Sequence, residues 1–422
     1  MEKNRYQSRR VSLLKQIEDR AIVILFSFDA PHRSADAYYP YHINRHFYYL
    51  TGLKRSNFTL LLQKDGEKIF EFLFIEEASD YATKWLGKRL TKSEASLISG
   101  VDEKSIYYVE AFDSFLHAQV LSGTRKALAR SPKSIYLDLF KDKPFALPAS
   151  LVKMDHVIKA YPDLAIRNIG EFIDIMRMYK DEFEIKETSR AIGYSKYAIE
   201  AVLSNAKPGI NERSIQALYE YSLKIAGSEG NSFNPIIASG SNATTLHYEE
   251  NDKDTQDGNL VLLDLGALAG PYASDISRTF PINGKFTERQ RQIYELVLSV
   301  NKACIDFVKP GIMMADLNQR ARDLLAEGAM KLGLIKTPEE IVKYYYHNVS
   351  HYLGLDVHDV GTYLVPLKAG IILTIEPGFY IDDESIGVRI EDNVLVTETG
   401  HVNLSESIIK EVKDIEKFMS KK

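Results

Sequence analysis

The sequence predicts an α/β domain at the N-terminus followed by an α+β domain at the C-terminus. The chain of 422 residues is too long for one core of ordinary size, so two domains are expected. Strand-like and helix-like stretches alternate over the first part of the chain, which is typical of an α/β fold. In the second part, two helices and an acidic hairpin occur twice. We therefore expect domains at residues 1–175 and 176–422.

In the N-terminal domain, short runs of aliphatic and aromatic residues predict strands, and amphipathic or helix-favouring stretches between them predict helices. The strands are expected at residues 21–28, 58–62, 70–75 and 134–138. The helices are expected at residues 5–19, 81–98 and 111–121.

In the C-terminal domain, each copy of the pattern has two long helices followed by a strand region and a hairpin. The helices are expected at residues 181–205, 211–227, 287–308 and 314–332. A curved antiparallel sheet with these helices on its outer face fits the pattern, and it leaves a concave face free. The alternative is a chance succession of ordinary α+β elements.

The first hairpin, NLVLLDLGALAGPYASDISRTFPING at residues 259–284, carries Asp264 and Asp275 on either side of a turn signal. A hairpin centred between Ala269 and Gly270 places the two acids directly opposite each other. Cross-strand partners point to the same face of a sheet, with Cβ atoms about 5 Å apart. This hairpin is therefore expected to present a pair of carboxylates.

The second hairpin, TIEPGFYIDDESIGVRIEDNVLVTETG at residues 374–400, carries Glu376 and Glu391 at equal distances from Asp383 and Glu384. Solvated residues on an open sheet face are the alternative, but the aliphatic flanks of the acids argue against it. Four carboxylates on such strands need cations, because buried charges must be paired. With a nearby histidine, the simplest arrangement is a two-metal site.

Four histidines lie in segments that suit such a site. His347, His351 and His358 fall within twelve residues in HNVSHYLGLDVHDVG, and His247 lies in TTLHYEEN. A lone histidine is more often a surface or core residue, but three in one apolar segment with glycines favour a functional role. One histidine with four carboxylates gives an oxygen-rich site, which suits Mn²⁺ or Co²⁺, and Zn²⁺ less well.

Composition excludes several other classes of protein. The 53 Lys and Arg residues against 58 Asp and Glu give a net charge of −5, which supports neither nucleic-acid binding nor a polybasic membrane surface. No stretch approaches the roughly 20 apolar residues of a membrane span. The lone cysteine, Cys304, lies in an apolar helical pattern and is expected in the core. It suits a reducing compartment, so we expect a cytoplasmic protein.

These segments resemble aminopeptidase P, the Xaa-Pro aminopeptidases of the pita-bread (creatinase/aminopeptidase-like) metallopeptidase fold. DLGALAGPYASDISRTFPING is similar to the family's first metal segment, HNVSHYLGLDVHDVG to its histidine segment, and TIEPGFYI and GVRIEDNVLVT to its two glutamate segments. The resemblance implies two divalent metal ions, with Mn²⁺ favoured. It also implies that the metal ligands are Asp264, Asp275, His351, Glu376 and Glu391.

The resemblance further implies a role for each residue. Asp275 and Glu391 should bridge the metals, Asp264 should bind one, and His351 with Glu376 the other. His358 should stabilise the developing oxyanion, and Glu376 should carry a proton to the leaving proline nitrogen. Arg389 should point to the same face as Glu391 by the strand period and hold an acid there. The remaining site residues are expected to be catalytic His247 and substrate-binding His347 and Tyr380, with ordinary strand packing as the alternative for Tyr380.

Two N-terminal motifs also match this family. RSADAYYPYHINRHFYYLTGL at residues 33–53 and KWLGKRL at residues 84–90 are similar to its non-catalytic domain. Asp36 and Trp85 match family positions near a neighbouring subunit's active site. The resemblance thus implies a homo-oligomer, a dimer or a tetramer, in which these residues limit the substrate cleft. The alternative is an ordinary core tryptophan and a loop-capping aspartate.

The implied activity is release of the first residue from proline-containing peptides, with proline in second position. A prolidase would share the five ligands and cut only dipeptides, and the N-terminal motifs argue against it. A creatinase-like hydrolase does not keep the five ligands. A non-enzymatic binding protein on this scaffold would be expected to have lost some of them, and none is missing.

Overall fold

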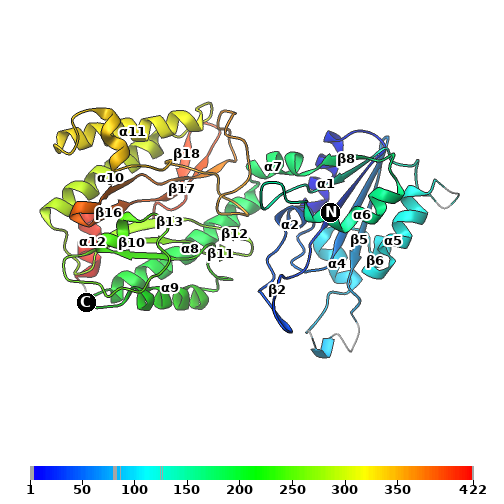
Figure 1. Ribbon diagram of the computed structural model, residues 1–422, viewed down its shortest axis with the longest axis horizontal. Helices are drawn as coiled ribbons and strands as arrows, with labels where there is room; N and C mark the ends of the chain where they lie inside the picture. Colours follow the sequence, from blue (N-terminus) through cyan, green and yellow to red (C-terminus); the bar gives the residue numbers. More distant parts are fainter. Residues whose placement is uncertain (1–3, 79–82, 86, 124, 126, 421–422) are drawn as a thin grey trace. The chain divides into compact units, whose positions relative to one another are not determined.

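The chain folds into two compact units, Met1–Met176 and Arg177–Lys422. The computed structural model describes residues 4–78, 83–85, 87–123, 125 and 127–420 (Figure 1). Within these ranges no helix has both the length and the apolar character needed to cross a bilayer.

The N-terminal unit is built on a six-stranded sheet in the order β6-β5-β4-β1-β7-β8. Its central strand, β1, pairs in antiparallel fashion with β4 and in parallel with β7. Every residue of β1 is buried, because helices or loops cover both faces of the sheet. The strands of this unit are β1 (Ala21–Phe26), β2 (His32–Ser34), β3 (Ala37–Tyr38), β4 (Thr59–Asp65), β5 (Lys68–Ile75), β6 (Ile106–Tyr108), β7 (Ser134–Leu137) and β8 (Ala165–Asn168).

Helices alternate with these strands, so the predicted α/β class is confirmed. The helices are α1 (Arg5–Gln16), α2 (Arg45–Thr51), α4 (Lys92–Ser99), α5 (Phe112–Phe115), α6 (Ala149–Ala160) and α7 (Gly170–Met178). The chain continues from α5 as a π-helix at Leu116–Leu121. Aromatic side chains from β1, β5 and α5 pack together in the core on one face of the sheet.

The prediction of one helix over residues 81–98 is wrong. Gly87 has a positive φ of 81°, which a helix does not contain, and α4 begins only after Thr91. The Thr91 side chain caps the helix and forms a reciprocal capping box with Glu94. Residues 81, 82 and 86 lie outside the described residues.

The C-terminal unit has two three-stranded sheets, β13-β10-β9 and β14-β17-β18, and two small hairpins, β11-β12 and β15-β16. Its strands are β9 (Ile236–Ser239), β10 (Leu260–Leu265), β11 (Leu268–Ala269), β12 (Tyr272–Ala273), β13 (Ile276–Pro281), β14 (Ile372–Ile375), β15 (Gly378–Ile381), β16 (Ile386–Arg389), β17 (Asp392–Val396) and β18 (His401–Asn403). Every pairing among them is antiparallel, as predicted.

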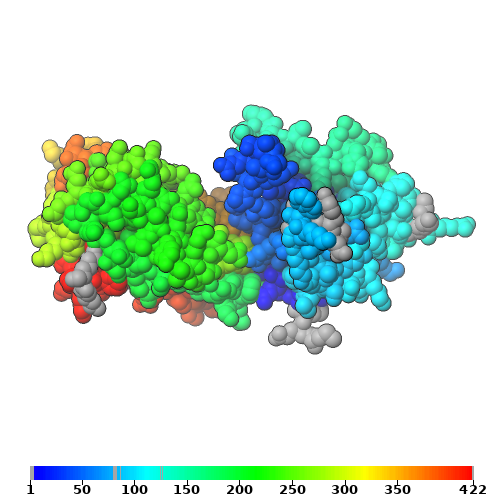
Figure 2. All heavy atoms as spheres, turned by 90° about the horizontal axis from the view of Figure 1, so that it is seen from below, coloured from blue at the N-terminus to red at the C-terminus, as the bar shows by residue number. Residues whose placement is uncertain are grey.

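The four long helices of this unit lie where the sequence predicts them. They are α8 (Glu182–Asn205), α9 (Glu212–Ala226), α10 (Glu288–Phe307) and α11 (Met314–Lys331), and a shorter helix, α12 (Val412–Met419), ends the described chain. Polar side chains fix where three of them begin, because Asp181, Asn211 and Thr287 each accept a hydrogen bond from a backbone N–H of the first turn. Seen from below in Figure 2, the green atoms of α8 and α9 cover much of this unit.

The sheet that contains β10 has one face towards the helices and one face that carries polar groups. Along β10, Val261, Leu263 and Leu265 belong to the large apolar core that the long helices share. Leu262 and Asp264 point the other way, since side chains alternate along a strand. The helices therefore support the sheet from behind, and the opposite face is available for chemistry.

Candidate metal centre and active site

The first acidic hairpin is centred one residue later than the sequence predicts. Ala269 pairs with Tyr272, and Asp264 pairs with Ser277 rather than with Asp275. Gly270 has a φ of 59°, as the first central residue of a two-residue type II′ turn requires, and this fixes the centre after Gly270. Asp275 precedes Ser277 by two residues, so it still points to the face of Asp264 as a diagonal neighbour.

The second acidic hairpin has the predicted register. Ile375 pairs with Asp392 on one side of the acids, and Gly378 pairs with Arg389 on the other. Both pairs have the same centre, so Glu376 lies opposite Glu391 in the short break between the two ladders. The hairpin thus directs both glutamates to one face.

The structure brings the five predicted metal ligands together. Asp275, His351 and Glu391 each offer a ligand atom within 4.8 Å of the others. His351 Nε2 lies 3.4 Å from Asp275 Oδ2 and 3.5 Å from Glu376 Oε1. Asp264 is close enough to Asp275 to raise its pKa. Two hairpins and a histidine segment that are far apart in the sequence therefore meet at one point.

The carboxylates fit a cation site because several of their oxygens have no protein partner. Asp264 Oδ1, Asp275 Oδ1 and Glu391 Oε1 are buried and accept no hydrogen bond from the described residues. Buried polar atoms normally have a partner, and such oxygens are those that divalent cations bind. Burial, together with the neighbouring acids, raises the pKa of Asp275 and of Glu391. Burial also raises the pKa of Glu376.

His351 presents one ring nitrogen to these acids. Its Nδ1 lies 3.0 Å from the backbone oxygen of Tyr352. This contact favours the tautomer in which Nδ1 carries the proton and donates a hydrogen bond to that oxygen. That tautomer leaves Nε2 unprotonated and facing Asp275 and Glu376. A backbone carbonyl that orients a ligand histidine in this way is common at metal sites.

Arg389 is the cation that the protein itself supplies. Its Nη2 donates to Asp264 Oδ2 at 2.6 Å, and its Nε donates to Ser277 Oγ at 2.9 Å. Its Nη1 donates to the hydroxyl of Tyr380 at 3.1 Å. Arg389 therefore holds Asp264 from behind, and the other oxygen of Asp264 stays available to a metal ion.

The other predicted histidines surround the centre at different depths. The His358 ring is exposed and lies against His351, with ring centroids 4.2 Å apart. Although the residue is exposed, its ring is partly desolvated by the surrounding protein, and this effect, then the neighbouring His351 and His247, lower the pKa of His358. His247 is exposed in the turn after the short helix η4 (Gly240–Thr244). The lowered pKa keeps the His358 ring neutral near pH 7 and available to a substrate.

His347 and Tyr380 form a pair beside the centre. His347 Nε2 lies 2.9 Å from the Tyr380 hydroxyl, and His347 Nδ1 lies 2.7 Å from the backbone oxygen of Asn348. Burial lowers the pKa of His347 to about 3, so its ring is neutral. Tyr380 is itself buried in the strand, with its hydroxyl between His347 and Arg389.

Three supporting residues of the site were not predicted from the sequence. Ser277 donates to Glu391 Oε2 at 2.7 Å, Thr374 donates to Glu376 Oε1 at 3.3 Å, and Asn393 donates to the backbone oxygen of Asp275 at 2.6 Å. Each lies two residues from a predicted ligand in the sequence. The strand period of two, which pointed to Arg389, could have pointed to these residues as well.

Asp36 and Trp85 both lie in the N-terminal unit. Asp36 is exposed in the turn between β2 and β3, and Trp85 is 73% exposed. The alternative of a core tryptophan is therefore excluded. Cys304 is buried in the core of the C-terminal unit, as predicted, and burial raises its pKa to about 12.

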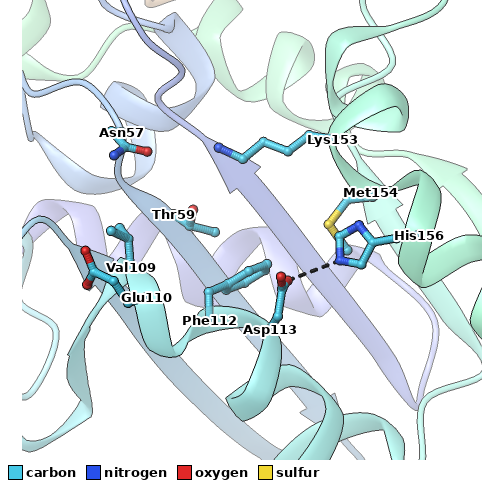
Figure 3. A pocket seen from close by; sticks show the side chains of 9 residues that line it. All are labelled: Asn57, Thr59, Val109, Glu110, Phe112, Asp113, Lys153, Met154 and His156. Atoms are coloured by element: carbon cyan, nitrogen blue, oxygen red, sulfur yellow. Dashed lines mark hydrogen bonds and ion pairs between the residues drawn. The ribbon is translucent and has the colours of Figure 1, made fainter.

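A pocket of about 380 Å³ lies in the N-terminal unit (Figure 3). Lys153, Met154 and His156 of α6 face Phe112 and Asp113 of α5 across it, and His156 Nε2 lies 3.2 Å from Asp113 Oδ1. It contains none of the residues predicted for the site. The chemistry-bearing side chains gather instead on the acidic face of the C-terminal unit.

Comparison with known families matches both units. Residues 186–398 match the model of metallopeptidase family M24, and residues 6–128 match the N-terminal domain of aminopeptidase P. The first match contains all five predicted metal ligands. The second contains both Asp36 and Trp85.

Relatives and solved structures match over nearly the whole chain. A Xaa-Pro aminopeptidase of Haemophilus influenzae is 33% identical over 99% of this chain and 97% of its own. A structure assigned as an aminopeptidase P from Bacillus anthracis is 43% identical, covers 100% of this chain and 99% of its own, and has a TM-score of 0.95. Aminopeptidase P from Escherichia coli with the inhibitor Pro-Leu is 30% identical over the same shares, with a TM-score of 0.89. The chain thus belongs to metallopeptidase family M24 and, with its N-terminal domain, to the aminopeptidase P group within it.

Proposed function

We propose that this protein is a Xaa-Pro aminopeptidase, which releases the first residue of a peptide whose second residue is proline. The observation that carries the proposal is the set of buried carboxylate oxygens on Asp264, Asp275 and Glu391 that have no partner among the described residues. They lie beside His351 and Glu376 in a family of metal-dependent exopeptidases. Such a set is suited to holding two cations rather than to stabilising a fold.

Two divalent metal ions, with Mn²⁺ favoured over Co²⁺ and Zn²⁺, would be held by the five ligands. Asp275 and Glu391, each with one unpartnered carboxylate oxygen, would be shared by the two ions in this proposal. Asp264 would bind one ion, and His351 with Glu376 the other. When bound, the ions supply a water that ionises near neutral pH and polarise the substrate carbonyl.

The other side chains have roles that follow from their positions. The carboxylate-rich face suits the free α-ammonium group of the substrate. His358 and His247 donate hydrogen bonds to the scissile carbonyl and its neighbourhood, where negative charge develops. Glu376 takes up the proton that the attacking water loses and passes it to the leaving proline nitrogen. Arg389 keeps Asp264 in place through its hydrogen bond. His347 and Tyr380 form the wall beside the substrate.

The preference for proline has independent support. Relatives from Escherichia coli and Haemophilus influenzae that match nearly the whole chain are named Xaa-Pro aminopeptidases, and the aminopeptidase P structure from Escherichia coli holds an inhibitor that begins with proline. Proline in second position makes the scissile bond a tertiary amide and fixes φ near about −65°, so the ring offers a rigid apolar face. The full-length relatives also disfavour the prolidase alternative.

Product analysis tests the proposal directly. The protein with Mn²⁺ is incubated with Xaa-Pro, Xaa-Pro-Xaa and Xaa-Ala-Xaa peptides, and the products are identified by mass. We expect the first residue to be released from Xaa-Pro-Xaa and the alanine peptide to stay intact. Acetylation of the α-amine should abolish cleavage. Cleavage confined to Xaa-Pro dipeptides would indicate a prolidase, and equal cleavage of the alanine peptide would overturn the proline preference.

We also propose a cytoplasmic homo-oligomer in which Asp36 and Trp85 limit the cleft of a neighbouring subunit. The exposure of both side chains supports a role at a surface rather than in a core. The single cysteine, Cys304, is consistent with a reducing compartment. Light scattering of the active protein tests the assembly, and a fully active monomer would contradict it.

A further inference from the structure

A cluster of four charged side chains, three of them buried, lies beside the metal centre and outside the proposed mechanism. Arg177 Nη2 donates to Asp359 Oδ1 at 2.6 Å and to Asp356 Oδ2 at 2.7 Å. Lys180 Nζ donates to Asp359 Oδ2 at 3.0 Å. The side chains of Arg177, Lys180 and Asp359 are 3%, 1% and 1% exposed, so their charges interact almost without water.

Asp359 is the centre of this cluster. Burial alone would raise the pKa of Asp359, but Lys180 and Arg177 outweigh that effect and hold it below its ordinary value. Both carboxylate oxygens are engaged, one by each cation. Buried charges of this kind keep a fixed geometry, because any movement leaves a charge without its partner.

The cluster anchors a segment that has no helix or strand of its own. Residues 353–361 form an irregular loop, and hydrogen bonds tie it at few points. Asp359 N donates to Tyr352 O at 2.9 Å, and Ala273 N donates to Gly354 O at 2.9 Å. Gly354 is packed so closely that a Cβ there would lie 2.2 Å from Asp359 Oδ2 and 2.8 Å from Lys180 Cε. The loop is therefore fitted around the buried carboxylate.

His358 directly precedes Asp359 in this loop. Among the residues that the structure describes, no hydrogen bond holds the His358 ring, which meets His351 only by an edge-on ring contact. The backbone must then determine where the ring lies. We propose that Lys180 and Arg177, acting through Asp359, are positioning residues that hold His358 over the metal centre. This inference rests on the proposed function, because the effect is on its rate.

A double-mutant cycle in the Mn²⁺-loaded protein tests this inference. Lys180→Met removes one charge and keeps an unbranched side chain that is one atom shorter. We expect kcat for a Xaa-Pro-Xaa peptide to fall roughly 10-fold or more, because displacing a catalytic group slows the reaction by such a factor. The metal content should stay at the wild-type level. Lys180→Arg should restore most of the rate. In a His358→Ala background, Lys180→Met should lower kcat less than about 2-fold further.

A merely structural role gives a different result. If Lys180 only stabilises the fold, the fall in kcat is equal in both backgrounds, and the inference is overturned. Arg10→Met is the matched control, since it also removes a buried cation, which is paired with the carboxylate of Glu71 in the N-terminal unit. It should lower Tm and leave kcat of the folded protein unchanged.

If Lys180→Met does not fold, Asp356→Asn takes its place, because it removes one partner of Arg177 at the half-exposed edge of the cluster. We expect Asp356→Asn to lower kcat by a smaller factor, roughly 2- to 5-fold. As with Lys180→Met, its effect should not add to that of His358→Ala. Failure of the wild-type protein to cleave any Xaa-Pro peptide would reject the proposed function. Cleavage by the wild type with additive effects would reject only this inference.

Discussion

Arg389 and Asp264 lie 125 residues apart in the sequence and are joined by a hydrogen bond of 2.6 Å. One oxygen of Asp264 accepts from the guanidinium, while the other is buried without a partner among the described residues. Arg389 is buried, and its own pKa is raised, since Tyr380, Asp264 and Glu376 outweigh the cost of burial. The pair thus combines a fixed support for the acid with an oxygen that stays available for a cation.

Removing this support should destabilise the metal-free protein. Arg389→Met leaves Asp264 buried without its partner, which typically costs about 3–5 kcal/mol. Urea unfolding in the presence of a chelator measures the loss. Arg289→Met is the control, because the ion pair of Arg289 with Glu384 is one-third exposed and contributes at most about 1 kcal/mol. Equal losses in the two variants would contradict the structural role given to Arg389.

Loss of a proposed bridging carboxylate should lower metal content and activity together. A chelator should abolish activity, and Mn²⁺ should restore it. Asp275→Ala or Glu391→Ala should reduce the bound metal, as elemental analysis of the purified variants would show, because each removes a ligand shared by two ions. Glu384→Gln, at the exposed tip of the same hairpin as Glu391, should keep both ions. Full activity of a metal-free preparation would contradict the metal assignment.

The stability of the metal-free protein should fall as pH rises. The pKa values of Asp275, Glu376 and Glu391 are raised by burial and, for Asp275 and Glu391, by neighbouring acids, so the folded state binds protons that the unfolded state has released above about pH 4. Stability from these protons is complete below about pH 4 and is lost as pH rises through the raised values. Mn²⁺ should remove this dependence, because a cation replaces the protons.

Measurements of Tm from about pH 5 to about pH 8, with chelator and with Mn²⁺, test this prediction. Glu391→Gln isolates the effect from other titrating groups, since its amide cannot ionise. When both proteins are metal-free, the Tm of the wild type should fall further over this pH range than the Tm of the variant. An equal change in the two proteins would show that Glu391 titrates normally.

The positions of the acids could be predicted from the sequence because strands repeat every two residues and the flanking residues are strongly β-forming. The register of the second hairpin followed from symmetry about Asp383 and Glu384. The predicted centre of the first hairpin was wrong by one residue, since the sequence Ala269-Gly270-Pro271 allows two centres of the turn. Only the positive φ of Gly270 decides between them. The prediction that Asp264 and Asp275 point to the same face was still correct, because Asp275 is the diagonal neighbour of Asp264 and diagonal neighbours lie on the same side of a sheet.

Other features could not be predicted because they depend on contacts between distant segments. Nothing near Asp359 in the sequence indicates that Arg177 and Lys180 reach it from about 180 residues away. The helix boundaries were predicted well where a polar cap begins the helix, as at Asp181, and badly over residues 81–98, where Gly87 breaks the helix. Local signals therefore identify elements and single site residues, while tertiary packing determines how they are supported.

Ligand and non-ligand histidines should respond differently to the same substitution. His351→Ala should lose metal and activity, because its Nε2 faces Asp275 and Glu376 at 3.4 and 3.5 Å. His247→Ala and His358→Ala should keep wild-type metal content and lose kcat/KM by roughly 10²-fold or more if each donates to the developing oxyanion. Metal analysis beside kinetics on a Xaa-Pro-Xaa peptide separates the two groups. Loss of metal from His358→Ala would show that His358 is a ligand, and the edge-on contact of its ring with His351 would then need a different explanation.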